Sequence, residues 1–97
     1  MDIAEIAAKM TEALGKAGGT DKSVKFDFGD DGVVFASGSE ASNEDNEADC
    51  TISVSKEDFI SLAEGNLDPM MAFMSGKLKV AGDMSVAMGL QSLFNNM

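Results

Sequence analysis

The chain has 97 residues, which is enough for one compact domain built around a single core. Its 17 acidic residues outnumber 7 lysines and no arginine is present, so the net charge is −10 and the basic stripe that nucleic-acid binding requires is missing. The chain has no histidine, the commonest general base and metal ligand, and no apolar run approaches the roughly 18 to 20 residues that cross a bilayer.

An amphipathic helix is predicted at the start of the chain. Apolar residues recur at spacings of three and four from Ile3 to Leu14, which places them on one helical face. Asp2 has the residue type of an N-cap, and Gly15 stands where the helix is expected to end. Residues 17–21 then read as a connector.

A strand hairpin is predicted after the connector. Between residues 24 and 28, valine and phenylalanine alternate with polar residues, which indicates a half-buried strand. Residues 29–32 contain the Asp-Gly pair that is favoured in tight strand reversals, and residues 33–36 supply the returning strand.

The middle of the chain begins with a polar segment, which is followed by a segment in which apolar and polar residues alternate. The acidic residues 37–47 fit either a short edge strand or a loop. Residues 48–54 show the cleanest alternation in the chain, which predicts a strand with one covered face. Cys50 is expected to point toward that covered face.

Residues typical of helix ends predict two short helices, and an alternating pattern predicts a last strand. Ser55 and Asp58 resemble a capping box at the start of a helix that Gly65 ends. Pro69 favours a second helix over 70–75, because proline suits a first helical position. Residues 77–80 alternate lysine with leucine and valine, as in a half-exposed strand.

We expect no catalytic residue, no metal site and no cofactor, and therefore no enzyme activity. Cys50 is the single cysteine and has no histidine to activate it, so a small core residue is the better interpretation. Neighbouring acids such as Asp30 and Asp31 fall in predicted turns, where solvent explains them better than general acid–base chemistry.

The last segment is unusually apolar for so acidic a chain. Residues 84–97 contain no charged residue, and Asp83 is expected to cap a helix from Met84 to about Phe94. Its apolar residues occupy more than one helical face, so something besides the sheet is expected to cover it. A second protomer, a bound apolar ligand and a fully buried core helix are all open interpretations.

Methionine favours the bound ligand, because flexible thioethers suit a cavity wall that adapts to variable apolar guests. Five of the eight methionines lie between residues 70 and 88: Met70, Met71, Met74, Met84 and Met88. Gln91 interrupts the apolar surface, and its spacing fits an outward polar residue as well as a cavity group.

Several segments together resemble the sterol carrier protein 2 domain. They are ADCTI at 48–52, GNLDP at 65–69, AFMSGKLKVAGDM at 72–84 and AMGLQSLF at 87–94. The resemblance covers residues 48–94, about half of the chain, and the first half agrees in its order of helix, hairpin and acidic turn.

The resemblance implies an α+β fold in which residues 1–97 form a single domain. Its sheet would have five mostly antiparallel strands and be covered by helices, with an apolar tunnel between sheet and helices. Gly76 and Gly82 would be structural. Carried over by position, the tunnel wall would consist of Phe73, Met74, Met84, Ala87, Met88, Leu90, Gln91 and Phe94.

The expected function is intracellular lipid binding or transfer, with a fatty acid, acyl-CoA, phospholipid or sterol as the partner. Fatty acyl chains or phospholipid are expected before sterol. Membrane contact should be brief, and the chain should be a monomer or a weak homodimer. The alternative is a non-catalytic interaction module that hides the same apolar surface in a dimer or against a larger enzyme.

The two ends of the chain suggest the compartment. The start at Met1–Glu5 lacks the basic residues and apolar stretch of a secretory signal, and the end at Asn95–Met97 lacks a Ser-Lys-Leu-like peroxisomal address. The unpaired Cys50 agrees with a reducing environment. A cytoplasmic location, in a bacterium, is therefore expected.

Overall fold

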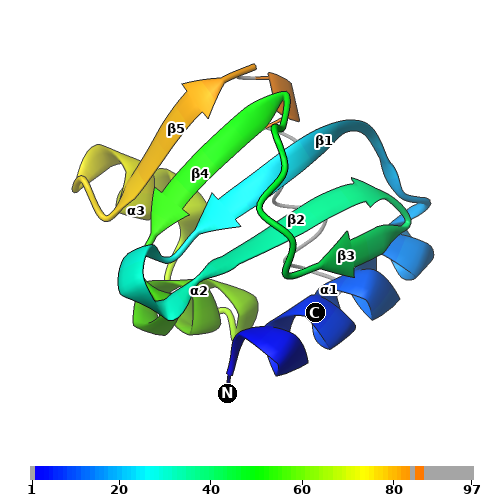
Figure 1. Ribbon diagram of the computed structural model, residues 1–97. Helices are drawn as coiled ribbons and strands as arrows, with labels where there is room; N and C mark the ends of the chain where they lie inside the picture. The colour runs from blue at the N-terminus through cyan, green and yellow to red at the C-terminus, as the bar shows by residue number, and fades with distance from the viewer. Residues whose placement is uncertain (1, 84, 87–97) are drawn as a thin grey trace.

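The computed structural model describes residues 2–83 and 85–86 and shows a twisted sheet with helices on one face (Figure 1). The strand order is β3-β2-β1-β4-β5. The five strands are β1 (Thr20–Asp27), β2 (Val33–Gly38), β3 (Glu40–Ser42), β4 (Cys50–Val54) and β5 (Leu78–Gly82). Neighbouring strands are antiparallel except β1 and β4, which are parallel. The expected α+β class with five mostly antiparallel strands is confirmed.

Helix α1 (Ile3–Ala17) begins as predicted and ends three residues later than predicted. The Asp2 carboxylate accepts a hydrogen bond from the Glu5 backbone N–H at 2.9 Å, and one helical face is buried. Gly15 was expected to end the helix, but the chain leaves it at Gly18, whose φ is 86°. The left-handed conformation that closes a helix falls at Gly18, and its backbone N–H donates to the Leu14 carbonyl oxygen.

The hairpin between β1 and β2 is confirmed, but its turn differs from the prediction. A single 3-10 turn, η1 (Gly29–Asp31), replaces the tight Asp-Gly reversal. Gly32 has a φ of 109°, and the Phe28 backbone N–H donates to its carbonyl oxygen at 2.9 Å. An added Cβ on Gly32 would lie 2.7 Å from the Ile3 Cδ1 atom. The positive φ therefore favours glycine at this position, and the Ile3 side chain lies close to it.

The acidic segment after β2 contains both of the expected structures, an edge strand and a loop. β3 is the edge strand, and the Ala41 backbone N–H donates to the Thr11 hydroxyl of α1 at 3.0 Å. Residues 43–49 then cross the helix-free face of the sheet to reach β4 (Figure 1). The Lys25 Nζ atom lies 2.8 Å from the Asp45 Oδ1 atom and ties this crossing to β1.

Helices α2 (Lys56–Ala63) and α3 (Pro69–Met74) follow β4 and start at the predicted caps. The Ser55 hydroxyl accepts from the Asp58 backbone N–H at 3.1 Å, and the Asp68 carboxylate accepts from the Met70 backbone N–H at 2.8 Å. The two helices connect β4 to β5, and α3 ends beside the start of β5 (Figure 1).

The core lies between the sheet and the helices. Cys50, Ile52 and Val54 of β4 point into it, which confirms the predicted alternation. Phe59 of α2 packs edge-on against Phe26 and Phe28, with ring centroids 5.2 and 5.3 Å apart. The buried set also includes Ile6, Met10, Leu14, Val24, Val34, Leu62, Ala72 and Leu78.

Candidate functional site

Helix α3 presents an exposed apolar surface. Its exposed residues are Met70 (67% exposed), Met71 (61%), Phe73 (44%) and Met74 (75%), and they are the large apolar side chains that stand exposed in the described part of the chain. Ala72 is the buried residue of this helix. Burying a methionine or phenylalanine side chain contributes about 1.5 to 3 kcal/mol, and exposed groups of such side chains are typical of interaction surfaces, so α3 is a candidate binding surface.

The backbone around α3 holds this surface outward. Asp68 and Pro69 begin the helix, and Ala72 anchors it in the core. After the helix, the Lys77 backbone N–H donates to the Ala72 carbonyl oxygen at 2.9 Å, and Gly76 takes a φ of 81°. The chain thus reverses within three residues and places the buried Leu78 in β5.

Only part of the expected tunnel wall falls within the described residues. Phe73 and Met74 lie there, and both are exposed on α3. Six expected site residues lie outside the described residues: Met84, Ala87, Met88, Leu90, Gln91 and Phe94. The assignment of the tunnel wall therefore stays a prediction.

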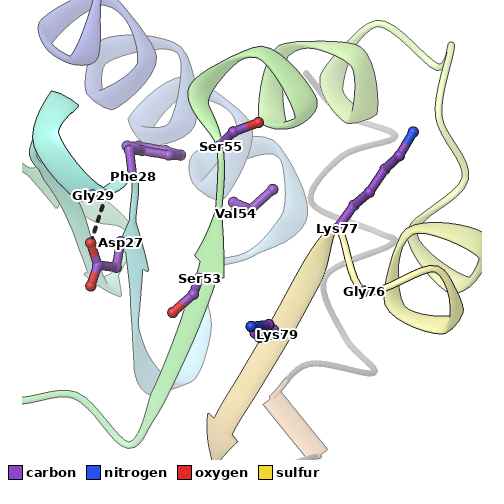
Figure 2. A pocket seen from close by; sticks show the side chains of 9 residues that line it. All are labelled: Asp27, Phe28, Gly29, Ser53, Val54, Ser55, Gly76, Lys77 and Lys79. Carbon is purple, nitrogen blue, oxygen red and sulfur yellow. Dashed lines mark hydrogen bonds between the residues drawn. The ribbon is translucent and has the colours of Figure 1, made fainter.

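An open hollow of about 360 Å³ lies where β1 and β4 end and β5 begins (Figure 2). Its lining is mixed in polarity: Asp27, Phe28, Gly29, Ser53, Val54, Ser55, Gly76, Lys77 and Lys79. The Asp27 Oδ1 atom accepts from the Gly29 backbone N–H at 2.9 Å. With two lysines and an aspartate in its wall, this hollow differs in character from the expected apolar tunnel.

A polar cluster holds the chain where it leaves β5. Lys22 of β1 forms an ion pair with Asp83, and the Asp83 Oδ1 atom accepts from the Ser85 backbone N–H at 2.9 Å and from its hydroxyl at 2.6 Å. The Asp83 backbone N–H donates to the Asp49 carbonyl oxygen at 2.9 Å. Val86 then packs against the core. The predicted capping role of Asp83 is thus seen at the first residues after it.

The same cluster changes the acidity of its members. The hydrogen bond from Lys22, followed by those from Ser85, lowers the pKa of Asp83 from 3.8 to about 2. The hydrogen bond and charge of Asp83 raise the pKa of Lys22. Burial, and secondarily the charge of Asp83, raises the pKa of the Cys50 thiol, which favours the less reactive protonated form.

Sequence reasoning did not single out Lys22, which pairs with Asp83, or Lys77 and Lys79, which line the hollow. Asp83, the partner of Lys22, is 61 positions away, so no local sequence pattern predicts this ion pair. A charge count would have found the other two, because residues 69–82 contain both lysines and no acid in a chain of net charge −10.

No group of three or more cysteine, aspartate or glutamate residues in the described ranges is arranged to hold a metal ion. Within residues 2–83 and 85–86, no helix combines the length and apolar character needed to cross a membrane.

Comparison with known proteins identifies a family that matches almost the whole chain and relatives that match more than half of it. The profile of the SCP-2 sterol transfer family matches residues 5–95. Sterol carrier protein 2 of Homo sapiens is 48% identical over 61 residues, which make up 63% of this chain and 11% of the human protein. Hydroxysteroid dehydrogenase-like protein 2 of Bos taurus is 48% identical over 52 residues, or 54% of this chain and 12% of the bovine protein. The chain spans about one tenth of the length of these relatives.

A solved structure shares the fold over almost the whole chain. It is the solution structure of sterol carrier protein 2 from Aedes aegypti in complex with the C16 fatty acid palmitate. Its TM-score is 0.79 at 16% identity, and the match covers 96% of this chain and 94% of the Aedes chain. The arrangement of sheet and helices in Figure 1 is therefore that of a sterol carrier protein 2 fold.

Proposed function

The chain belongs to the SCP-2 sterol transfer family, and from this premise we propose that it is a non-catalytic carrier that binds a single-tailed or phospholipid-like ligand in an apolar tunnel. The exposed apolar surface of α3 carries the proposal, because four large apolar side chains are held outward on one short helix. An acyl chain of about 14 methylenes contributes on the order of 10 kcal/mol when buried, before the costs of ordering it. Micromolar affinity would then need no polar anchor.

The proposed tunnel wall combines α3 with the uncharged segment after β5. It consists of Phe73, Met74, Met84, Ala87, Met88, Leu90, Gln91 and Phe94. Fatty acid, acyl-CoA or phospholipid is the proposed ligand class, ahead of sterol, and the palmitate bound by the Aedes relative supports that order. The missing histidine and the buried Cys50 thiol support a role without catalysis. The unpaired thiol also supports a reducing, cytoplasmic location.

Binding of a fluorescent fatty acid to delipidated protein tests this function. We expect saturable micromolar binding to the wild type, and loss of that binding in Met88→Lys, because a charge in an apolar tunnel is strongly disfavoured. Ala8→Lys is the matched control, since Ala8 is exposed on α1 and outside the proposed wall. Circular dichroism verifies that both variants fold. Equal binding by folded Met88→Lys and Ala8→Lys proteins would overturn the proposed wall.

Native mass spectrometry of the protein as purified identifies the ligand class. Extra mass that matches an acyl lipid and travels with the monomer supports the carrier. A lipid-free dimer that also fails to bind added fatty acid contradicts the carrier function.

A second candidate function is an interaction module that buries the α3 surface against another protein. The relatives favour this candidate in one respect, because in them the matched region is about one tenth of a longer chain. Sedimentation velocity distinguishes the two functions. A dimer that forms without lipid and dissociates in Met74→Asp supports the module, whereas a monomer that binds fatty acid supports the carrier.

A further inference from the structure

Three methionine side chains of α3 stand in solvent on one side of the helix. Met70, Met71 and Met74 are 67%, 61% and 75% exposed. At about 100° of rotation per residue, they leave the helix within an arc of about 100°, and the buried Ala72 lies roughly opposite. Figure 1 shows α3 at the border of the fold, beside the start of β5. The thioether groups of α3 are therefore open to oxidants dissolved in water.

The other oxidisable side chains in the described part of the chain are protected. Met10 is 0% exposed in the core. Cys50 is also 0% exposed, and burial raises the pKa of its thiol, which favours the less reactive protonated form. The chain contains no tryptophan, tyrosine or histidine. Within the described ranges, the α3 methionines are therefore the side chains that a peroxide should oxidise first.

Oxidation of a thioether by hydrogen peroxide is an oxygen transfer. A lone pair of the sulfur attacks one peroxide oxygen, the O–O bond breaks, and the second oxygen leaves as water after a proton shift. The sulfur is oxidised to a sulfoxide while the peroxide is reduced. The product is polar, so an apolar methionine becomes a hydrogen-bond acceptor. A methionine sulfoxide reductase reverses the step with thiols, which are oxidised to a disulfide while the sulfoxide oxygen leaves as water.

The fold of α3 does not depend on these three side chains. Ala72 anchors the helix in the core. The Asp68 carboxylate caps the helix on the Met70 backbone N–H at 2.8 Å, and the Lys77 backbone N–H donates to the Ala72 carbonyl oxygen at 2.9 Å. These contacts use backbone atoms and the Asp68 carboxylate, and no thioether takes part in them. Oxidation therefore changes the polarity of the surface and leaves the helix in place.

We propose that Met70, Met71 and Met74 form a reversible oxidation site, at which peroxide converts the exposed apolar surface of α3 into a polar one and weakens the binding of apolar ligands. The effect on ligands rests on the proposed function, in which Met74 belongs to the tunnel wall. The site itself rests on the exposure of the three side chains and on thioether chemistry. A carrier with this site holds less cargo under oxidising conditions.

Peptide mapping after treatment with hydrogen peroxide tests the site. Cleavage after lysine puts the α3 methionines in peptide 57–77 and Met10 in peptide 10–16. Each α3 methionine should gain an oxygen atom about tenfold or more faster than Met10, because oxidation of Met10 requires the core to open. The same treatment in concentrated urea is the matched control, in which both peptides should react at similar rates. Equal rates in the folded protein would overturn the proposal.

Hydrophobic-interaction chromatography and a fluorescent fatty acid measure the change in the surface. Oxidised protein that keeps its circular dichroism spectrum should elute earlier and bind the fatty acid about tenfold more weakly, because a polar sulfoxide is disfavoured in an apolar site. Methionine sulfoxide reductases A and B with dithiothreitol should restore both properties. Oxidised α3 with unchanged elution and unchanged affinity would overturn the proposed switch and leave the carrier standing.

A sulfur-free helix provides the matched variant. Met70→Leu/Met71→Leu/Met74→Leu keeps apolar side chains at all three positions, so its elution and its affinity should be the same before and after peroxide, whatever their values. Met10→Leu is the control and should respond to peroxide as the wild type does, since leucine and methionine are similar in volume. A triple variant that still responds would place the sensitive residue outside α3 and overturn the proposal.

Failure of the carrier function gives a different result. Wild-type protein that binds no fatty acid before peroxide would overturn the carrier. The peptide map and the elution shift do not depend on a lipid, so they would still uphold or overturn the oxidation site.

Discussion

At the scale of single residues, Gly82 is the described glycine at which an added side chain would meet the shortest contact. Its φ is 103°, and an added Cβ would lie 2.4 Å from the Asp49 carbonyl oxygen. Since that oxygen also accepts the hydrogen bond from Asp83, the backbone of β4 cannot move away without losing a contact. The close approach of two strands at this point, together with the positive φ, requires glycine.

We expect Gly82→Ala to destabilise the protein by about 2 kcal/mol or more, through strain at the positive φ and the clash with Asp49. Gly15→Ala is the matched control, because Gly15 lies within α1 and nothing stands within 4 Å of an added Cβ. That substitution should stabilise the protein by about 1 kcal/mol. Urea unfolding followed by circular dichroism measures both. Equal effects of the two alanines would contradict the structural role of Gly82.

The Asp83 carboxylate predicts a stability change in acid. Folding lowers the pKa of Asp83 from 3.8 to about 2, so the folded state favours the charged carboxylate. The stabilisation is complete above pH 3.8 and is lost as the pH falls through about 2. Carboxyl ¹³C NMR should show Asp83 titrating near the lower value, and Lys22→Gln should move its pKa upward. Titration of the wild-type group near 3.8 would contradict the ion pair.

At the scale of elements, Phe59 of α2 is buried against two aromatic rings of the sheet side of the core. The ring lies between Phe26 of β1 and Phe28 just after it, at centroid distances that suit edge-to-face packing. The Ser55 cap fixes where the helix begins, and Leu62 is the next buried residue on the same face. Phe59 and Leu62 are therefore the buried side chains through which α2 packs on the core.

Phe59→Leu should cost about 1 to 3 kcal/mol, because two edge-to-face contacts are lost while an apolar side chain remains. Phe35→Leu serves as the control, since Phe35 is only half-buried and lies on the helix-free face of β2; it should cost about 0.5 kcal/mol or less. Thermal unfolding by calorimetry compares the two. A smaller loss for Phe59 than for Phe35 would show that α2 does not depend on the aromatic cluster.

At the scale of the whole molecule, charge repulsion is the dominant electrostatic feature. The net charge of −10 is spread over 97 residues, and the ion pairs recorded among the described residues are Lys16–Glu12, Lys22–Asp83 and Lys25–Asp45. All three include a well-exposed partner, so each contributes little to stability. Self-repulsion of the acids therefore outweighs the attraction within the pairs.

Salt should consequently stabilise this protein. Raising the ionic strength from about 0.01 M to about 0.15 M shortens the screening length from roughly 30 to 8 Å. Relief of about 1 kcal/mol of repulsion would raise Tm by roughly 4 to 8 °C for a domain of this size. Glu47→Gln, at an exposed position in the segment 43–49, should raise Tm at low salt and make the rise of Tm with added salt smaller. A Tm that falls with salt would show that the ion pairs dominate.

The sequence by itself determined the order and type of most described elements, and it left residues 37–47 open between an edge strand and a loop. The apolar face of α1, the alternation in β4 and the caps at Ser55 and Asp68 depend on residues within a turn or two of one another. Local geometry is enough for such patterns. The errors fell at element ends, where Gly18 closes α1 in place of Gly15 and where a 3-10 turn at Gly29–Asp31 replaces the tight Asp-Gly reversal.

The tertiary structure alone decided which distant segments meet. The parallel pairing of β1 with β4, the Lys22–Asp83 ion pair and the outward position of α3 join or orient residues that no local pattern links. Of the predicted site, Phe73 and Met74 are placed on α3, where both are exposed. The physical reason is that periodicity and capping act within one element, whereas strand pairing and exposure depend on the packing of the whole chain.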